Sequence, residues 1–200
     1  AIVTADSDAG LYALRHSTAH VLAQAVLDLW PGATHAIGPP IEDGFYYDFE
    51  LPEGGVFTAD DLEAIDARMR EIIAADQAFE RFEAGSSEAL ELFAEHRYKR
   101  EIIEKVTAGA VDVEMIREAS ADGTVTWYRN GEGFVDLCTG PHVPSTGRLG
   151  HFALQKVAGA YWRGDEKQPM LQRIYGTAWA TEADLADYLD RLVEADKRDH

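Results

Sequence analysis

Cysteine and long apolar runs are both scarce in this sequence. The 200 residues contain one cysteine, Cys138, which cannot close a disulfide within the chain. We therefore expect a free thiol and a protein of the reducing cytoplasm. No apolar run is long enough to span a membrane, and no secretory leader is recognisable at the N-terminus. These absences favour a cytoplasmic protein that does not enter the membrane.

Positive charge is scarce as well. Lys and Arg number 18 against 36 Asp and Glu, which gives a formal net charge of −18. A protein that holds nucleic acid by its phosphates is expected to be basic, so this chain should repel a polyanion over most of its surface. Either nucleic acid is not the partner, or the chain contacts only a short piece of it while something else holds the rest.

The elements that the sequence predicts indicate an α+β fold, with a mainly antiparallel sheet packed with helices. Strand pairs at about 124–137 and 152–179 are hairpin-like, and strands do not alternate regularly with helices, which disfavours a doubly wound parallel sheet. We expect residues 1–10 to be a linker and 11–200 to be one domain, with a possible helical subdomain at about 58–120. Helices are expected at residues 11–29, after a capping box at Thr58-Ala-Asp-Asp61, after a cap at Ser86 or Ser87, near 96–109, and from Thr181.

Two pairs of ligand-type residues share one spacing. His16 and His20 lie four residues apart in the expected helix, on nearly the opposite side from its main apolar stripe. Small apolar residues flank them, so we expect a helix covered on both sides, with its imidazoles in a lined cavity. Cys138 and His142 repeat the spacing outside a helix, because Gly140-Pro141 intervenes. Strand alternation predicts that Asp136 and Cys138 point the same way.

Three interpretations of these residues compete. They are unrelated core residues, or a zinc site of three imidazoles and one thiolate, or a metal-free pocket in which imidazoles position and deprotonate water. The spacing does not separate the second from the third. The sequence has neither common glycine-rich phosphate loop and no Gly-x-Ser-x-Gly elbow. Lys99, in a basic run with Arg97 and Arg100, is expected on pattern alone to be solvated.

Several longer motifs carry a resemblance, in a fixed order along the chain. They are His16-Ser-Thr-Ala-His20, Ala36-Ile-Gly-Pro39, Gly44-Phe-Tyr-Tyr-Asp48, Asp136-Leu-Cys-Thr-Gly-Pro-His142, Ala158-Gly-Ala-Tyr-Trp-Arg-Gly-Asp165 and Leu171-Gln-Arg-Ile-Tyr-Gly-Thr-Ala-Trp179. Together they resemble the editing domain of bacterial threonyl-tRNA synthetase, from about Leu11 to His200. The two histidine and cysteine motifs are shared with alanyl-tRNA synthetase editing domains, and the longer Trp-containing stretches favour the threonyl type.

The resemblance implies an editing hydrolase that cleaves seryl-tRNA(Thr) and spares threonyl-tRNA(Thr), because its pocket excludes the extra methyl. It implies a catalytic set of His16, Lys99, His20, Cys138 and His142. Asp136 would bind the ammonium group or hydroxyl of serine, and Tyr47 with the Gly38 backbone would hold the terminal adenosine. Lys99, in the Tyr98-Lys99 pair, then becomes catalytic rather than solvated.

The resemblance also implies the cofactors and partners. The threonyl type is taken to work without metal, so we expect none, with zinc at His16, His20, Cys138 and His142 as the alternative. Partners would be the 3′ end of tRNA(Thr) carrying serine and the remaining domains of a larger synthetase, a homodimer in full length. The acidic charge fits a domain that receives only that 3′ end. The rival functions are an alanyl-type zinc hydrolase and a non-catalytic, zinc-stabilised tRNA-binding module.

Overall fold

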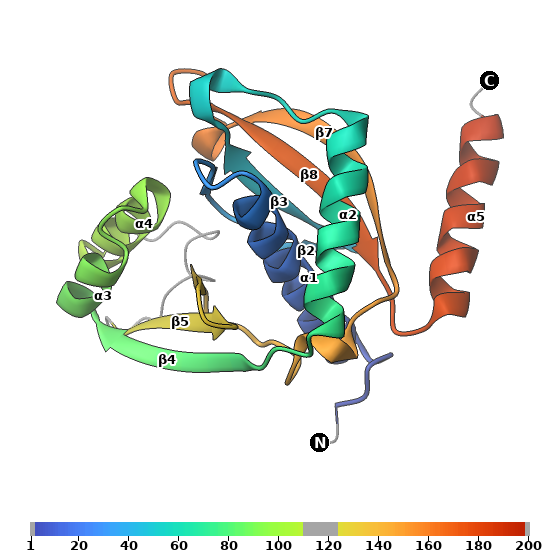
Figure 1. Ribbon diagram of the computed structural model, residues 1–200, viewed down its shortest axis with the longest axis horizontal. Coiled ribbons are helices and arrows are strands. Elements are labelled where there is room, and N and C mark those ends of the chain that lie inside the picture. Colours follow the sequence, from blue (N-terminus) through green and yellow to red (C-terminus); the bar gives the residue numbers. More distant parts are fainter. Residues whose placement is uncertain (1–2, 110–123, 199–200) are drawn as a thin grey trace.

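The fold is built from two antiparallel sheets and the helices that cover them (Figure 1). A computed structural model describes residues 3–109 and 124–198. In the larger sheet, β3 (Gly44–Glu50) pairs with β8 (Met170–Ala178), which pairs with β7 (Phe152–Tyr161). Two short strands, β1 (Thr34–His35) and β2 (Pro40–Ile41), pair with successive halves of the other edge of β3. This topology confirms the predicted α+β class with antiparallel sheets.

Helix α1 (Asp8–Leu29) packs between the larger sheet and helix α2 (Ala59–Ala74). Every residue from Leu14 to Val26 is buried, as expected for a helix covered on both sides. The helix begins three residues before the predicted position, because the Ser7 side chain accepts a hydrogen bond from the Gly10 amide and caps it. Part of the expected linker over 1–10 is therefore helical.

The smaller sheet has the order β4 (Phe79–Gly85), β5 (Thr124–Asn130), β6 (Phe134–Leu137). Helices α3 (Ser86–Leu92) and α4 (Arg97–Thr107) pack against each other beside it. The hairpin predicted at about 124–137 is present, with Gly131 at a φ of 59° in its Asn-Gly turn. Ser86 is the first residue of α3 rather than its cap, since Gly85 occupies the cap position.

Side chains of β6 alternate between two hydrophobic clusters. Phe134 packs with α1, α2 and the larger sheet, whereas Val135 and Leu137 pack with α3 and α4. This alternation confirms the predicted strand phase. It also places Asp136, which follows Phe134 by two residues, at the junction of the two halves of the fold.

The predicted capping box of α2 is present, with Thr58 and Asp61 bonded reciprocally. The expected helical subdomain over about 58–120 stays a prediction, because 110–123 lie outside the described residues. Within the described part, α2 joins the cluster of α1, while α3 and α4 belong to the other cluster.

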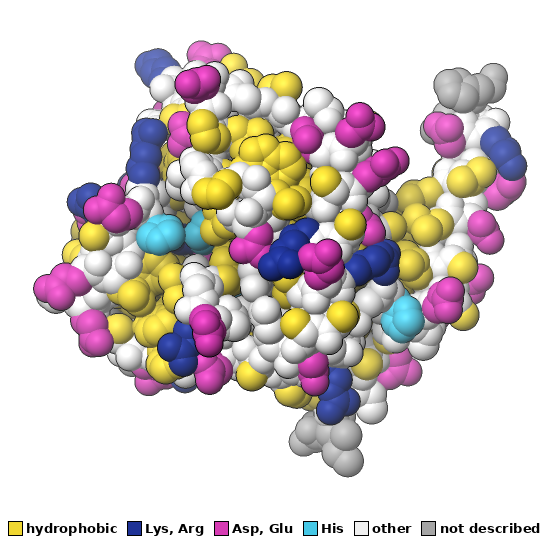
Figure 2. Space-filling model, in the orientation of Figure 1, with side chains coloured by type: hydrophobic (Ala, Val, Ile, Leu, Met, Phe, Trp, Pro, Cys, Tyr) yellow, Lys and Arg dark blue, Asp and Glu magenta, His cyan; other side chains and the backbone are white. Residues whose placement is uncertain are grey.

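Helix α5 (Glu182–Arg198) stands apart from the body of the fold (Figure 1). It has no buried residue, and the exposed fractions of Leu192 and Val193 are 40% and 53%. Its Tyr188 ring contacts Trp179, with the two ring centroids 5.2 Å apart. Figure 2 shows apolar side chains on the side of α5 that faces the body. In the part of the chain that the structure describes, no helix is both long and apolar enough to cross a bilayer.

Candidate functional site

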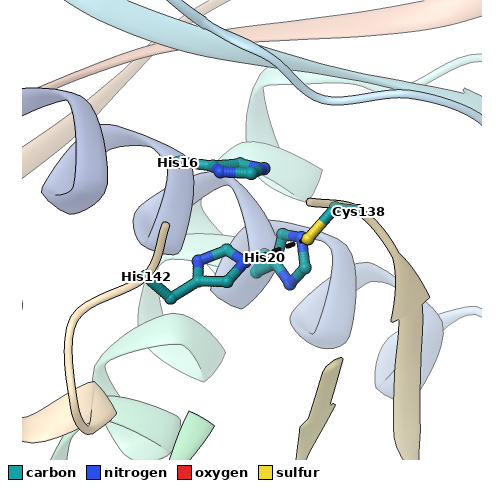
Figure 3. A group of neighbouring side chains, drawn as sticks. All are labelled: His16, His20, Cys138 and His142. Atoms are coloured by element: carbon teal, nitrogen blue, oxygen red, sulfur yellow. Dashed lines mark hydrogen bonds between the residues drawn. The ribbon is translucent and has the colours of Figure 1, made fainter. Parts of the chain in front are cut away.

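Helix α1 and the loop after β6 bring the two ligand-type pairs together. The His142 ring centroid lies 4.4 Å from that of His16 and 4.1 Å from that of His20. The Cys138 sulfur lies 3.2 Å from Nε2 of His142, the contact dashed in Figure 3. A cis peptide bond between Gly140 and Pro141 lies in the loop that turns His142 back toward Cys138. Residues 118 or more positions apart in sequence thus form one cluster of side chains.

The loop is fixed by contacts on both sides of His142. The Cys138 amide donates to the Thr126 carbonyl at 3.2 Å, which extends the β5–β6 pairing by one residue. The Phe79 ring stacks on the His142 ring at 4.9 Å, and the Tyr128 ring meets it edge-on at 4.5 Å. These contacts hold the imidazole against α1.

Asp136 is the centre of a second, fully buried group of polar side chains. Its Oδ2 accepts a hydrogen bond from the Tyr47 hydroxyl at 2.6 Å and lies 3.1 Å from His20 Nε2. Its Oδ1 lies 2.8 Å from Lys99 Nζ and 3.5 Å from His35 Nε2. Five secondary-structure elements, α1, β1, β3, α4 and β6, supply these five residues. His20 belongs to both groups and joins them into one site.

The charges in this site are set by burial and by the Lys99 ammonium. Burial raises the pKa of Asp136, but the Lys99 ammonium and the His20 and His35 rings lower it, and the net direction is well below the usual value. Burial lowers the pKa of His20 to about 3, so this imidazole is neutral at physiological pH. Burial and the neighbouring His20 and His16 rings also lower the pKa of His142. The site therefore combines an ionised carboxylate, the Lys99 ammonium and the neutral imidazoles of His20 and His142.

Comparison with known proteins finds similarity to threonine–tRNA ligases. Residues 125–175 match the family model described as threonyl and alanyl tRNA synthetase second additional domain. Threonine–tRNA ligase of Rubrobacter xylanophilus is 54% identical over 198 residues, which cover 99% of this chain and 28% of the relative. Threonine–tRNA ligases of Acidithiobacillus ferrooxidans and Maricaulis maris are 53% and 52% identical, over 100% of the chain and 29% of each relative.

These matches fit an editing domain of threonyl-tRNA synthetase. It spans less than a third of the length of the threonine–tRNA ligases that it matches. The match to the family model begins inside β5 and ends inside β8, so it includes Asp136, Cys138 and His142. The matches to the threonine–tRNA ligases extend over this whole chain. They therefore also include α1 and α4, which carry His16, His20 and Lys99.

The position of Lys99 differs from the solvated position expected on pattern alone. A basic run predicted a solvated side chain, but Lys99 is fully buried in the editing-domain fold. The reason is the phase of α4, whose buried residues are Tyr98, Lys99, Ile102 and Ile103. This phase turns Lys99 toward Asp136, while Arg97 and Arg100 remain outside the buried face. The family resemblance placed Lys99 in the site, as the structure does.

The backbone at Gly38 lies directly against the Tyr47 ring, and the absence of a side chain at Gly38 permits this close approach. A Cβ added at Gly38 would overlap the Tyr47 ring, so only glycine fits there without displacing the tyrosine. Tyr47 in turn is 1% exposed and stacks on Phe49 with ring centroids 5.2 Å apart. The neighbouring residue Tyr46 has a different partner, since the Arg173 guanidinium lies 3.8 Å from its ring centroid.

The donor set of the family motif fits a metal ion. His16, His20, Cys138 and His142 each offer one ligand atom, and these atoms all lie within 4.8 Å of one another. His20 Nδ1 is buried and has no hydrogen-bond partner within residues 3–109 and 124–198, while Nε2 faces Asp136. An imidazole that faces a carboxylate with one nitrogen and keeps the other available is the usual arrangement of a zinc ligand. The four residues could therefore hold zinc.

Sequence reasoning missed two residues of the site. His35 is 1% exposed and faces Asp136, but it precedes the Ala36-Ile-Gly-Pro39 motif in a two-residue strand that gave no pattern. Ser17 lies inside the first motif, and its hydroxyl oxygen is 3.0 Å from His142 Nδ1. A serine in the middle of a helix, where it has no capping role, was the available signal for Ser17.

Proposed function

We propose that this domain hydrolyses the ester of seryl-tRNA(Thr) to free serine and tRNA(Thr), and spares threonyl-tRNA(Thr). The observation that carries the proposal is the convergence of neutral imidazoles and an ionised carboxylate in one buried site. The similarity to threonyl-tRNA synthetase sequences supports the choice of an aminoacyl-tRNA ester as substrate. The products balance, because water adds across the ester bond and yields a carboxylic acid and a ribose hydroxyl.

In this proposal Asp136 recognises the amino acid. Its ionised carboxylate is a suitable partner for the serine ammonium group or hydroxyl. Lys99 compensates the charge of Asp136 and, with His16, positions the water that attacks the carbonyl; the ribose hydroxyl next to the ester assists. Tyr47 acts through the hydrogen bond that its hydroxyl donates to Asp136, and the Gly38 backbone beside it holds the terminal adenosine. His20, Cys138 and His142 form the wall opposite Lys99.

Selection between serine and threonine needs a second site for a physical reason. The two amino acids differ by one methyl group, and such a difference changes binding by only about 1–3 kcal/mol. A synthetic site that holds threonine therefore admits serine too often. A rigid pocket that is too small for the methyl rejects threonine by steric overlap, and serine alone is hydrolysed.

The partners in this proposal are the single-stranded 3′ end of tRNA(Thr) and the other domains of a full-length synthetase. The net charge of −18 opposes binding of the tRNA body by this domain alone. The rest of the enzyme, which we propose to be a homodimer in the cytoplasm, would hold that body. The domain itself would neither activate threonine nor use ATP.

Deacylation assays with variants test the proposal. Seryl-tRNA(Thr) is incubated with the 200-residue chain, with His16→Ala, with Lys99→Ala, and with Arg100→Ala as a matched control from the exposed side of α4. We expect the first two substitutions to reduce the hydrolysis rate at least about 100-fold, since general acid–base and charge-stabilising groups contribute about that much. Arg100→Ala should keep full activity. Full activity of Lys99→Ala would remove Lys99 from the mechanism.

A zinc-dependent site is the second candidate, and the donor set with its available His20 Nδ1 favours it. Zinc there would either activate a water, as in an alanyl-type hydrolase, or only stabilise a tRNA-binding module. Metal analysis of the purified chain, followed by the deacylation assay with a chelator, separates the candidates. Unchanged activity in chelator supports the metal-free mechanism. Loss of activity that zinc restores supports the hydrolase, and stoichiometric zinc without activity supports the binding module.

A further inference from the structure

The Ser17 hydroxyl oxygen lies within hydrogen-bond distance of three other polar groups. Ser17 Oγ is 2.7 Å from the Ala13 carbonyl oxygen, 3.0 Å from the Val143 amide nitrogen and 3.0 Å from Nδ1 of His142. The side chain is fully buried, so no contact with bulk water competes. A hydroxyl has one hydrogen to donate and two lone pairs that accept. Its three contacts therefore use its whole capacity.

Two of the three contacts have only one possible direction. The Val143 amide can only donate, so Ser17 Oγ accepts there. The Ala13 carbonyl can only accept, so at 2.7 Å the serine hydrogen must point toward it. If the hydrogen pointed to His142 instead, two oxygen atoms would face each other at that distance with no hydrogen between them, which is repulsive.

The third contact then follows from the first two. With its hydrogen given to Ala13 and one lone pair taken by Val143, Ser17 Oγ can only accept from His142 Nδ1. We infer that Ser17 is a positioning residue that holds His142 in the tautomer with its hydrogen on Nδ1. The Nε2 lone pair of His142 then faces the Cys138 sulfur 3.2 Å away. Burial keeps the ring neutral, so the choice of tautomer decides what Nε2 can do.

This tautomer prepares Nε2 for either chemistry of the site. A lone pair on Nε2 accepts the thiol hydrogen of Cys138 or a proton of a bound water, and it is equally the atom that a metal ion needs. The opposite tautomer would place an N–H against the sulfur and remove that lone pair. The effect on hydrolysis rests on the proposed function, whereas the tautomer itself does not.

Nitrogen NMR of the histidine rings tests the inference directly. Long-range proton–nitrogen spectra of the ¹⁵N-labelled chain, with chelator present, distinguish a protonated ring nitrogen from one with a lone pair. We expect His142 Nδ1 to be protonated and Nε2 to carry the lone pair. Ser17→Ala should shift both signals toward the other tautomer. Thr18→Val is the matched control, because the Thr18 hydroxyl donates to the Leu14 carbonyl in the same way but makes no hydrogen bond to His142 among the described residues.

The same variants are then assayed for deacylation of seryl-tRNA(Thr). Ser17→Ala should reduce kcat about 10- to 100-fold with little change in KM, as is typical when the partner of a site imidazole is removed. Thr18→Val should leave both unchanged. Thermal unfolding of both variants checks that each is folded.

The outcomes separate this inference from the proposed function. A lone pair on His142 Nδ1 in the unsubstituted chain, or a tautomer that Ser17→Ala leaves unchanged, overturns the inference even if the chain hydrolyses its substrate. The expected tautomer, together with its change in Ser17→Ala, supports the inference even if the chain proves inactive on seryl-tRNA(Thr). Inactivity of that kind would overturn only the proposed function.

Discussion

At the scale of single residues, the site depends on how Lys99 and Asp136 compensate each other. Their exposed side-chain fractions are 1% and 2%, and 2.8 Å separates Lys99 Nζ from Asp136 Oδ1. An ion pair this deeply buried loses most of its hydration, so each member needs the other to remain charged. The hydroxyl of Tyr47 and the ring of His20 add further donors to the carboxylate. Asp136 can therefore stay ionised in a place where an isolated carboxylate would take up a proton.

Removing either member of this pair should destabilise the fold. We expect Lys99→Met to lower the free energy of unfolding by about 3–5 kcal/mol, because it leaves a buried carboxylate without its ammonium. The double variant Lys99→Met, Asp136→Asn should lose less than the sum of the two single losses, with a coupling of about 1–3 kcal/mol. Urea denaturation of the four proteins measures this coupling. Additive losses would contradict the ion pair described above.

At the scale of elements, the local structure could be predicted from sequence and the long-range contacts could not. The helix that carries His16 and His20 and the phase of β6 follow from periods of 3.6 and 2, which are local properties. Nothing in those periods brings Cys138 to His20, because that contact depends on how α1 packs beside β6. The prediction that Cys138 and His20 share one site came from the family resemblance. Lys99 shows the limit most clearly, since its basic run predicts a solvated residue and only the phase of α4 turns it inward.

The junction of α2 with the 3₁₀ turn η2 (Thr146–Arg148) makes stability depend on pH. Hydrogen bonds from the Ser145 hydroxyl and the Gly147 amide lower the pKa of Asp76, which sits just after α2. A carboxylate with a lowered folded-state pKa stabilises the fold above its unfolded pKa of about 3.9, and this stabilisation is lost as pH falls through the folded pKa. Asp76→Asn should therefore be less stable than the unsubstituted chain at pH 7.

That difference should begin to shrink below about pH 4, where the unfolded chain takes up its proton, and should vanish once the pH falls below the lowered folded-state pKa of Asp76. Urea midpoints of both proteins at pH 7 and at pH 3 measure it. Glu63→Gln, an exposed carboxylate change within α2, serves as the control and should show no such pH-dependent difference. A gap between Asp76→Asn and the unsubstituted chain that is the same at both pH values would refute this role of Asp76.

At the scale of the whole molecule, the charge and the position of the site suggest that this domain receives only the 3′ end of the tRNA. Other domains of a larger enzyme would hold the tRNA body. The chain carries a net charge of −18 and spans less than a third of its relatives. Figure 2 shows acidic side chains spread over the visible face rather than gathered in one place. The site itself lies at the junction of the two sheets, where five elements supply its buried polar side chains. It offers little to attract a long polyanion.

The isolated chain should therefore bind tRNA weakly, with an affinity that falls as salt is raised. Titration of fluorescently labelled tRNA(Thr) with the chain, at low salt and at about 0.15 M salt, measures both quantities. A short oligonucleotide with the sequence of the tRNA 3′ end is the control, and it should bind about as well as the whole tRNA. Tight binding of the whole tRNA at physiological salt would contradict this division of labour.

The ratio of the two hydrolysis rates tests directly whether the proposed site excludes the methyl group of threonine. Initial rates of deacylation are measured for seryl-tRNA(Thr) and threonyl-tRNA(Thr), with the same tRNA and the same chain concentration. If the pocket excludes the methyl group of threonine, the seryl ester should be hydrolysed at least about tenfold faster, and by more if the pocket is rigid. Equal rates for the two esters, or no hydrolysis of either above the uncatalysed rate, would contradict the account.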